Sequence, residues 1–258
     1  MKRLLLGLGV AAAMLCAASS AFAVGGVNIS WSTCFGENPS ASRNRTFACA
    51  SNAGTNLLVT SFVLDTLQLG AVSGTETVVD ILSATDPVPL WWQFRDIGTC
   101  RQTALGSNSI ADANNLVCVD WAQGQSAGGV GAYTSDPGNG WTIDPSVTLG
   151  QHRRLKLAFA VPLAGLQDLT QASEYFSANI SINNTKTVGT GACTGCNEPI
   201  CIVLNSIKVT TNTGAGNRTI SGGAAAGSDI VTWQGVGPNC QLVPTKNVTW
   251  GSVKALYR

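Results

Sequence analysis

The sequence predicts an all-β protein, a β-sandwich of two antiparallel sheets with a jelly-roll or an Ig-like Greek-key topology. Apolar and polar residues alternate in many short runs, and a period of two is typical of half-buried strands. Clusters of Gly, Asn, Ser and Pro separate these runs and provide turns. No long helical pattern interrupts them. These observations leave both topologies open.

The first residues have the pattern of a secretory signal peptide. Lys2 and Arg3 precede an apolar run, and Ala21-Phe22-Ala23 supplies a small-residue cleavage site. We therefore divide the chain into a signal peptide, residues 1–23, and a single disulfide-stapled β-sandwich domain, residues 24–258. The protein is expected to be secreted, extracellular or at the cell surface, with the periplasm as the alternative. No later run is long and apolar enough to span a bilayer, so we expect no membrane span in the mature chain.

The mature chain is close to electrical neutrality. Removing Lys2 and Arg3 from the 15 basic residues brings their number close to that of the 14 acidic residues. Such a chain lacks the excess positive charge that nucleic acids attract, so nucleic acid is not an expected partner. Only 11% of the residues are charged, which is low for a globular domain, and Gly, Ser, Thr and Asn supply the polar surface instead.

The N-terminal part of the mature chain is expected to contribute three strands, at Val27–Trp31, Thr46–Cys49 and Asn56–Leu67. The third is the longest, and its alternation places Val59 and Phe62 on opposite faces. Polar and Gly-containing segments separate the three runs.

The next predicted strand is Thr75–Ser83, with Val79 on the face opposite Asp80. A proline-containing segment follows, and it is expected at an edge or in an extended connection because proline cannot donate to a sheet. One helical turn is expected at Cys100–Leu105, and another strand at Leu116–Trp121.

A long Gly-rich loop is expected at Ala122–Gly150, and such loops in compact domains are usually functional or disordered. After it, Arg154 and Lys156 alternate with leucine and phenylalanine residues. This is the clearest amphipathic strand in the chain, and Pro162 ends it.

The stretch Glu174–Thr211 is predicted to be a hairpin of two alternating runs around a loop that carries three cysteines. In the first run, one face is expected to hold Phe176, Ala178, Ile180 and Ile182. In the second, one face is expected to hold Val203, Asn205, Ile207 and Val209. A late strand at Asp229–Gln234 and a short helix at residues 249–258 are expected to end the fold.

The cysteines predict disulfides, because an even set in an exported chain is usually paired. Of the 9 cysteines, Cys16 leaves with the signal peptide, and the others are Cys34, Cys49, Cys100, Cys118, Cys193, Cys196, Cys201 and Cys240. Cysteines that bracket one connection are expected to pair, which gives Cys34–Cys49 and Cys100–Cys118. For the rest we favour Cys193–Cys201 and Cys196–Cys240, because a Cys193–Cys196 bond closes a tight ring that is more usual in redox proteins.

One motif points to a serine hydrolase but lacks its context. Gly124-Gln-Ser-Ala-Gly128 matches G-x-S-x-G, and His152 is the only histidine, with Asp136 or Asp144 as a third member. The nucleophile elbow requires a helix after the serine, and the Gly-rich sequence that follows cannot form one. We therefore expect no catalytic residues here.

Two segments contain metal-ligand residue types. Cys193, Cys196 and Cys201 have a zinc-like spacing, but disulfides are favoured in an oxidising compartment. Asp136 to Asp144 offers oxygen ligands without the spacing of a calcium loop, and its residues are also those that make turns. No metal and no cofactor are expected.

Aromatic residues in or beside loops are the candidate ligand-binding residues, because exposed rings stack on sugars. They are Trp91, Trp92, Trp121, Tyr133 and Trp141. The alternative is that a sandwich of this size buries them.

The favoured function is that of a non-enzymatic secreted or cell-surface protein in adhesion, assembly or ligand binding. Its expected partners are a polysaccharide or another cell-surface protein, and its oligomeric state stays open. The alternatives are a carbohydrate-binding module and a secreted hydrolase that uses carboxylates such as Asp80, Asp120 or Glu174.

The segment TVGTGACTGCNEPICIVLNSIKV and the ending PTKNVTWGSVKALYR resemble a group of uncharacterised exported bacterial proteins, and the resemblance covers most of the mature chain. It implies a secreted, β-rich domain with paired cysteines. It implies no activity, ligand or catalytic residue.

Overall fold

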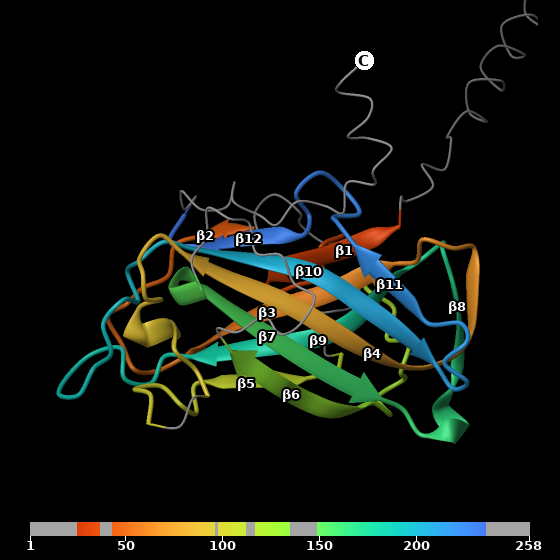
Figure 1. Ribbon diagram of the computed structural model, residues 1–258, viewed down its shortest axis with the longest axis horizontal. Coiled ribbons are helices and arrows are strands. Elements are labelled where there is room, and N and C mark those ends of the chain that lie inside the picture. The colour runs from red at the N-terminus through yellow and green to blue at the C-terminus, as the bar shows by residue number, and fades with distance from the viewer. Residues whose placement is uncertain (1–24, 37–42, 96–97, 112–116, 135–148, 236–258) are drawn as a thin grey trace, which may run out of the picture.

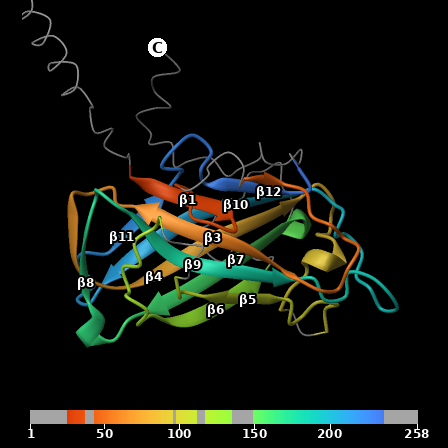
Figure 2. The same ribbon diagram turned by 180° about the vertical axis from the view of Figure 1, so that it is seen from behind.

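The computed structural model describes residues 25–36, 43–95, 98–111, 117–134 and 149–235. Within them the protein is an all-β sandwich of two packed sheets, as Figure 1 and, from behind, Figure 2 show. The predicted fold class is therefore confirmed. The described part of the chain contains no helix with the length and hydrophobicity that crossing a membrane requires.

The smaller sheet has four strands in the order β1-β3-β9-β5. Their bounds are β1 Gly26–Trp31, β3 Thr55–Val63, β9 Glu174–Asn183 and β5 Leu105–Asn108. All of its pairs are antiparallel. Alternating apolar residues on each strand bury one face of this sheet against the larger one.

The larger, eight-stranded sheet has the main order β2-β12-β10-β4-β7-β6, with β11 beside β10 and β8 beside β4. Their bounds are β2 Asn44–Arg45, β4 Gln68–Ser83, β6 Ala127–Thr134, β7 His152–Ala160, β8 Gln167–Thr170, β10 Ile200–Thr211, β11 Arg218–Ser221 and β12 Ile230–Trp233. Only β2 and β12 pair in parallel. Short 3-10 turns occur at Leu90–Trp92, Leu149–Gln151 and Leu163–Gly165.

Several predicted elements were wrong in kind or position. Thr46–Cys49 follows β2 without being a strand. Of the predicted strand Leu116–Trp121, the described residues 117–121 make one bridge, from Val119 to Tyr175. Cys100–Leu105 is a turn that leads into β5 instead of a helical turn, and the expected Gly-rich loop contains β6. The proposed C-terminal helix lies outside the described residues. Local alternation failed around Cys49, Cys100 and Cys118 because disulfides and turns, instead of ladder pairing, hold these segments, whereas β6 is a strand paired with β7.

The predicted central hairpin is also wrong, because β9 and β10 lie in different sheets. β9 pairs with β3 and β5, whereas β10 pairs with β4, β11 and β12. Residues 184–199, which join them, therefore cross one end of the sandwich. Both strands have a strongly apolar face, and placing them in opposite sheets buries the two faces against each other.

Two β-bulges reverse the alternation within these strands. In β10 the pairing with β4 skips Asn205, so Ile202 and Leu204 before it and Ile207 and Val209 after it all face the core. A bulge adds one residue on one strand and changes the phase of the side chains. The predicted grouping of Val203 with Ile207 and Val209 was therefore wrong.

In β9 the pairing with β3 skips Ser177. Ala178, Ile180 and Ile182 face the core as predicted, but Phe176 points to the outer side of the small sheet. There it packs with Val59 and with the disulfide of Cys34 and Cys118 in a second, smaller apolar cluster.

The observed disulfides differ from all of the predicted pairs that can be compared. Cys34 bonds to Cys118, Cys49 to Cys196 and Cys100 to Cys193, at sequence separations of 84, 147 and 93 residues. Cys201 is also disulfide-bonded. Cys240 lies outside the described residues. Pairing by proximity in the sequence failed because the sandwich brings distant segments together at its ends.

Candidate functional site

Residues 184–199, which we call the stapled loop, form an exposed projection at one end of the sandwich (Figure 1). Two disulfides hold it, from Cys193 to Cys100 and from Cys196 to Cys49, with Cα–Cα distances of 6.0 and 5.9 Å. Residues 189–192 at its tip are exposed. Gly189 and Gly191 there have positive φ angles, of 86° and 79°, which favour glycine.

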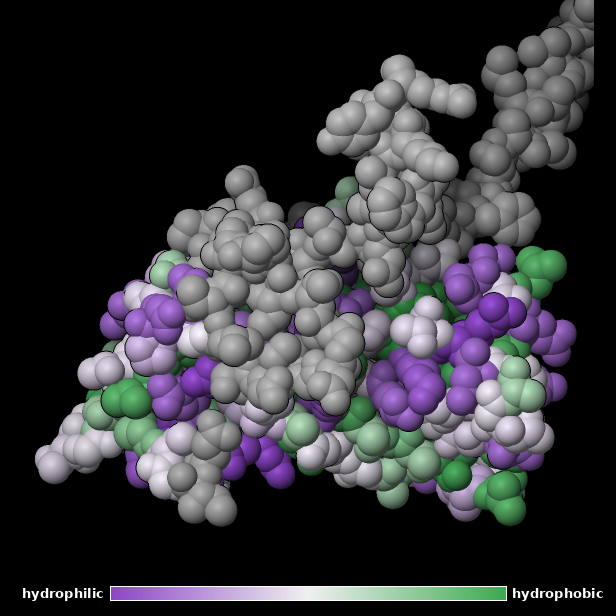
Figure 3. Space-filling model, viewed as in Figure 1, coloured by the Kyte–Doolittle hydropathy of each residue, from purple (hydrophilic) through white to green (hydrophobic). Residues whose placement is uncertain are grey.

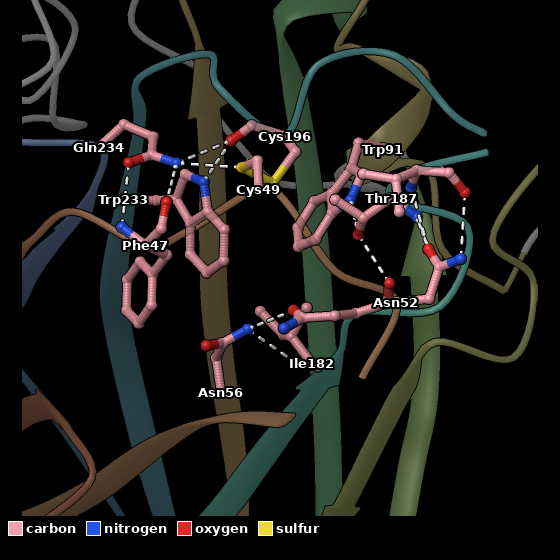
Figure 4. Close-up of a disulfide and its surroundings, with 12 residues drawn as sticks. Phe47, Cys49, Asn52, Asn56, Trp91, Ile182, Thr187, Cys196, Trp233 and Gln234 are labelled. Carbon is pink, nitrogen blue, oxygen red and sulfur yellow. Dashed lines mark hydrogen bonds between the residues drawn. A yellow bond between two sulfur atoms is a disulfide. The ribbon is translucent and has the colours of Figure 1, made fainter. Parts of the chain in front are cut away.

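Asparagine side chains fix the base of the stapled loop. The Oδ1 atom of Asn52 accepts hydrogen bonds from the backbone N–H groups of Thr187 at 2.7 Å and Val188 at 2.9 Å, and its Nδ2 donates to the carbonyl of Val188 at 3.0 Å. Asn184 Nδ2 donates to the carbonyl of Ala53 at 3.0 Å. These bonds tie the loop to the segment before β3, as Figure 4 shows for Asn52 and Thr187.

Buried tryptophans lie beneath the stapled loop (Figure 4). Trp91 Nε1 donates to Thr187 Oγ1 at 3.0 Å, and the Trp91 backbone N–H donates to the carbonyl of Thr194 at 2.9 Å. Trp233 Nε1 donates to the carbonyl of Cys196 at 2.6 Å, and its ring centroid lies 5.0 Å from that of Trp91. The loop therefore rests on rings that are themselves part of the core.

The aromatic residues predicted to bind a ligand do not form an exposed platform. The exposed fractions of Trp91 and Trp92 are 0%, that of Trp121 is 4% and that of Tyr133 is 6%. Trp141 lies outside the described residues. Only an exposed ring can stack on a sugar, so the burial of Trp91, Trp92, Trp121 and Tyr133 removes the basis for expecting sugar binding there.

A buried guanidinium joins the tryptophans to the start of the stapled loop. Arg101 is 2% exposed, and its Cζ lies 3.4 Å from the Trp91 ring centroid. Its side chain donates hydrogen bonds to the carbonyl oxygens of Trp91, at 2.8 Å, and Asn183. Burial lowers the pKa of Arg101 to about 9, although Tyr133 opposes the shift. A planar cation can stack on a ring and still use its in-plane donors.

A second buried charge cluster lies on the outer face of the large sheet. Asp80 Oδ1 accepts hydrogen bonds from His152 Nε2 at 2.8 Å and Arg154 Nε at 2.7 Å. Asp80 Oδ2 accepts from Arg154 Nη2 at 2.6 Å and Asn205 Nδ2 at 2.9 Å. The bulge in β10 thus aims Asn205 at the carboxylate. Burial by itself would raise the pKa of Asp80, but the bonds from His152 and Arg154 outweigh it and hold the pKa below its usual value.

The Asp80 cluster holds an Asp–His pair without a nucleophile in the described residues. His152 Nδ1 is buried and has no hydrogen-bond partner there, and Ser126 of the G-x-S-x-G motif accepts from Ser109 Oγ at 2.7 Å instead. A serine hydrolase needs the serine bonded to the histidine. Asp136 and Asp144 lie outside the described residues.

The structure does not bring together Asp80 and Glu174, two of the three carboxylates proposed for a hydrolase. Asp80 lies on the outer face of the large sheet, whereas Glu174 lies on the outer face of the small sheet and accepts from Asn28 at 3.0 Å and from Ser61 at 2.5 Å. Asp120 accepts from the backbone N–H groups of Ala122 and Gly124 and so caps a turn. Asp80 and Glu174 therefore join neighbouring strands, and Asp120 stabilises its own turn.

Beside the Asp80 cluster, the outer face of the large sheet has a shallow depression of about 300 Å³. It is lined mainly by Glu76, Val78, Gly131, Ala132, Lys156 and Ala158. Figure 3 shows hydrophobic and hydrophilic residues mixed over the uncovered part of this face. In the described residues, no group of three or more His, Cys, Asp or Glu side chains is placed to hold a metal ion. The residues that line the depression therefore form no recognisable catalytic or metal-binding group, and the stapled loop is the better candidate site.

The residues that shape the loop carry no sequence signal of their own. Asn52, Arg101 and Gln234 lie in segments without a motif, and each bonds a partner far away in the chain. The one available signal was the cluster of Cys193, Cys196 and Cys201, which indicated that disulfides hold this segment.

No protein-family model matches this chain, and no curated protein sequence matches it.

Proposed function

We propose that the mature protein is an extracellular, non-enzymatic binding protein that contacts a cell-surface protein through the exposed tip of the stapled loop. The disulfides support an oxidising, extracellular or periplasmic environment. The observation that carries the proposal is an exposed tip on a base held by two disulfides, Asn52 and Trp91. A loop held in one conformation loses little entropy on binding.

A protein partner is favoured over a polysaccharide by the composition of the surface. The tryptophans and tyrosines in the described residues, which would stack on sugars, are buried: Trp31, Trp91, Trp92, Trp121, Trp233, Tyr133 and Tyr175. The loop instead presents small side chains and backbone at its tip, with exposed Lys186 and Glu198 near its base. Such a surface is suited to hydrogen bonds with another polypeptide.

The test measures binding of purified residues 24–258 to cells of the source organism. Thr190→Lys places a long charged side chain at the exposed tip and should lower the apparent affinity about tenfold, a loss of roughly 1.4 kcal/mol. Thr219→Lys makes the same change on exposed β11 and should bind like the wild type. Protease treatment of the cells should abolish binding, and periodate treatment should not.

Equal binding by both variants would reject the loop as the binding site. Binding that survives protease and is lost after periodate would point to a carbohydrate partner instead.

A further inference from the structure

The two disulfides of the stapled loop share one short motif. Cys193 and Cys196 are separated by Thr194 and Gly195, and each bonds to a cysteine in a different part of the chain. The motif sulfurs are the inner ones, with Cys193 and Cys196 only 3% and 5% exposed. Their partners Cys49 and Cys100 are half-buried. A reductant therefore reaches either bond most readily at the sulfur outside the motif.

We propose that this pair of disulfides is a two-electron redox switch that opens as one unit. A thiolate of a dithiol reductant attacks Cys100 Sγ or Cys49 Sγ, and the thiolate released is always a cysteine of the motif. That thiolate attacks the other motif cysteine, forms a Cys193–Cys196 disulfide and releases the remaining distal cysteine. The second thiol of the reductant then resolves the mixed disulfide. In total the dithiol is oxidised to its disulfide, and its two hydrogens end on the thiols of Cys49 and Cys100.

The spacing and the surroundings of the sulfurs support this exchange. Two cysteines separated by two residues form the reversible disulfide of dithiol oxidoreductases. Gln234 Nε2 lies 3.3 Å from Cys49 Sγ as a donor, which it shares with the carbonyls of Phe47 at 2.9 Å and Cys196 at 3.1 Å (Figure 4). A donor at the sulfur stabilises a departing Cys49 thiolate, and a better leaving group speeds thiol–disulfide exchange.

The exchange removes both long-range staples of the loop at once. The loop is then held by hydrogen bonds without a covalent link, chiefly those of Asn52, Trp91 and Trp233. Arg101, next to Cys100, would no longer be tied to the loop through the Cys100–Cys193 bond. This inference rests on the proposed function where it concerns binding: the reduced form should bind the partner more weakly because its loop is less ordered.

The test is disulfide mapping of folded residues 24–258 after limited reduction. The protein is treated with about 0.1 mM dithiothreitol, free thiols are blocked with N-ethylmaleimide, and the digest is analysed by mass spectrometry. The expected first product carries the label on Cys49 and Cys100 and a disulfide between Cys193 and Cys196. Cys34–Cys118, which has no neighbouring cysteine in a C-x-x-C arrangement, should remain intact and serves as the internal control.

Label on Cys100 with Cys193, or on Cys49 with Cys196, would show independent reduction and overturn the proposal. The double variant Cys100→Ala/Cys193→Ala adds a kinetic measurement. A neighbouring thiolate has an effective concentration of millimolar order, so Cys49 should be released about tenfold more slowly in this variant than in the wild type.

Should that variant fail to fold, the mapping of the wild type alone still decides. The mapping does not use the binding partner, so it can fail while the Thr190→Lys test succeeds, and the reverse.

Discussion

At the scale of single residues, Asp80 and Arg101 are two buried charges that are held in different ways. Asp80 has donors from three side chains, on β7 and β10. Arg101 relies on two backbone carbonyl oxygens and on the face of Trp91. A buried charge is tolerated only where hydrogen bonds replace its hydration. The stability of both charges therefore depends on neighbouring strands and turns that keep these donors and acceptors in position.

Replacing Asp80 should destabilise the protein strongly at neutral pH. Asp80→Asn removes the carboxylate charge that faces the buried Arg154, and breaking a buried pair in this way costs about 3–5 kcal/mol. The folded-state pKa of Asp80 is lowered, so its stabilisation is present above the unfolded pKa and is lost as the pH falls through the folded value. Urea unfolding should show a large gap between wild type and variant at pH 7 that shrinks as the pH falls below the usual pKa of an aspartate.

The matched control for Asp80→Asn is Glu76→Gln on the same strand. Glu76 pairs with Lys208 at 3.1 Å, but the two side chains are 52% and 38% exposed. An exposed pair of this kind contributes at most about 1 kcal/mol. An Asp80→Asn effect no larger than that of Glu76→Gln would contradict the buried-pair interpretation.

At the scale of the elements, the bulges decide which side chains reach the core. In β10, Asn205 is the extra residue that keeps Leu204 and Ile207 on the same, inner face. In β9, Ser177 has the same effect on Ala178 and Tyr175, and its hydroxyl bonds to Thr77 of the opposite sheet at 2.9 Å. A bulge therefore serves both packing and the aim of a polar side chain.

Deleting Asn205 should prevent stable folding. Without the extra residue, either Ile207 and Val209 or Ile202 and Leu204 must turn outward, and each lost burial costs about 1.5–3 kcal/mol. Asn205→Ala keeps the bulge and loses one bond to a charged group, so it should cost only about 1.5–3 kcal/mol in total. Circular dichroism and thermal unfolding of the two variants check this. A deletion variant as stable as Asn205→Ala would show that the strand can slip.

At the scale of the whole molecule, disulfides join segments that the sheets bring together at different places. Cys34–Cys118 covers the outer face of the small sheet, whereas Cys49–Cys196 and Cys100–Cys193 close the end that carries the stapled loop. Each links residues far apart in sequence. Bonds across such long loops restrict the unfolded chain most in the loop-entropy description.

Cys201 should pair with Cys240 in the mature protein. Cys201 is disulfide-bonded, and six other cysteines already form three pairs with one another. Cys16 is expected to leave with the signal peptide, which leaves Cys240 as the partner. Peptide mapping of residues 24–258 should therefore find this bond, and thiol titration of the denatured, unreduced protein should find about zero free thiols. Free Cys201 and Cys240 thiols would refute the pairing.

The sequence by itself determined the properties that depend on neighbouring residues. The period of two identified most of the long strands, and Val79 and Asp80 lie on opposite faces as predicted. The cysteine set indicated disulfides, which seven of these residues form. Such features are local, because pleat geometry and composition are sufficient to specify them.

Only the tertiary structure decided which segments meet. It placed β9 and β10 in opposite sheets, paired Cys196 with Cys49, and buried Trp91 beneath the stapled loop. A strand pattern does not specify its partner, and a single bulge reverses its faces. The free energy that selects among these arrangements comes from packing two sheets over one core. That packing depends on contacts between residues far apart in the sequence, which a local pattern does not contain.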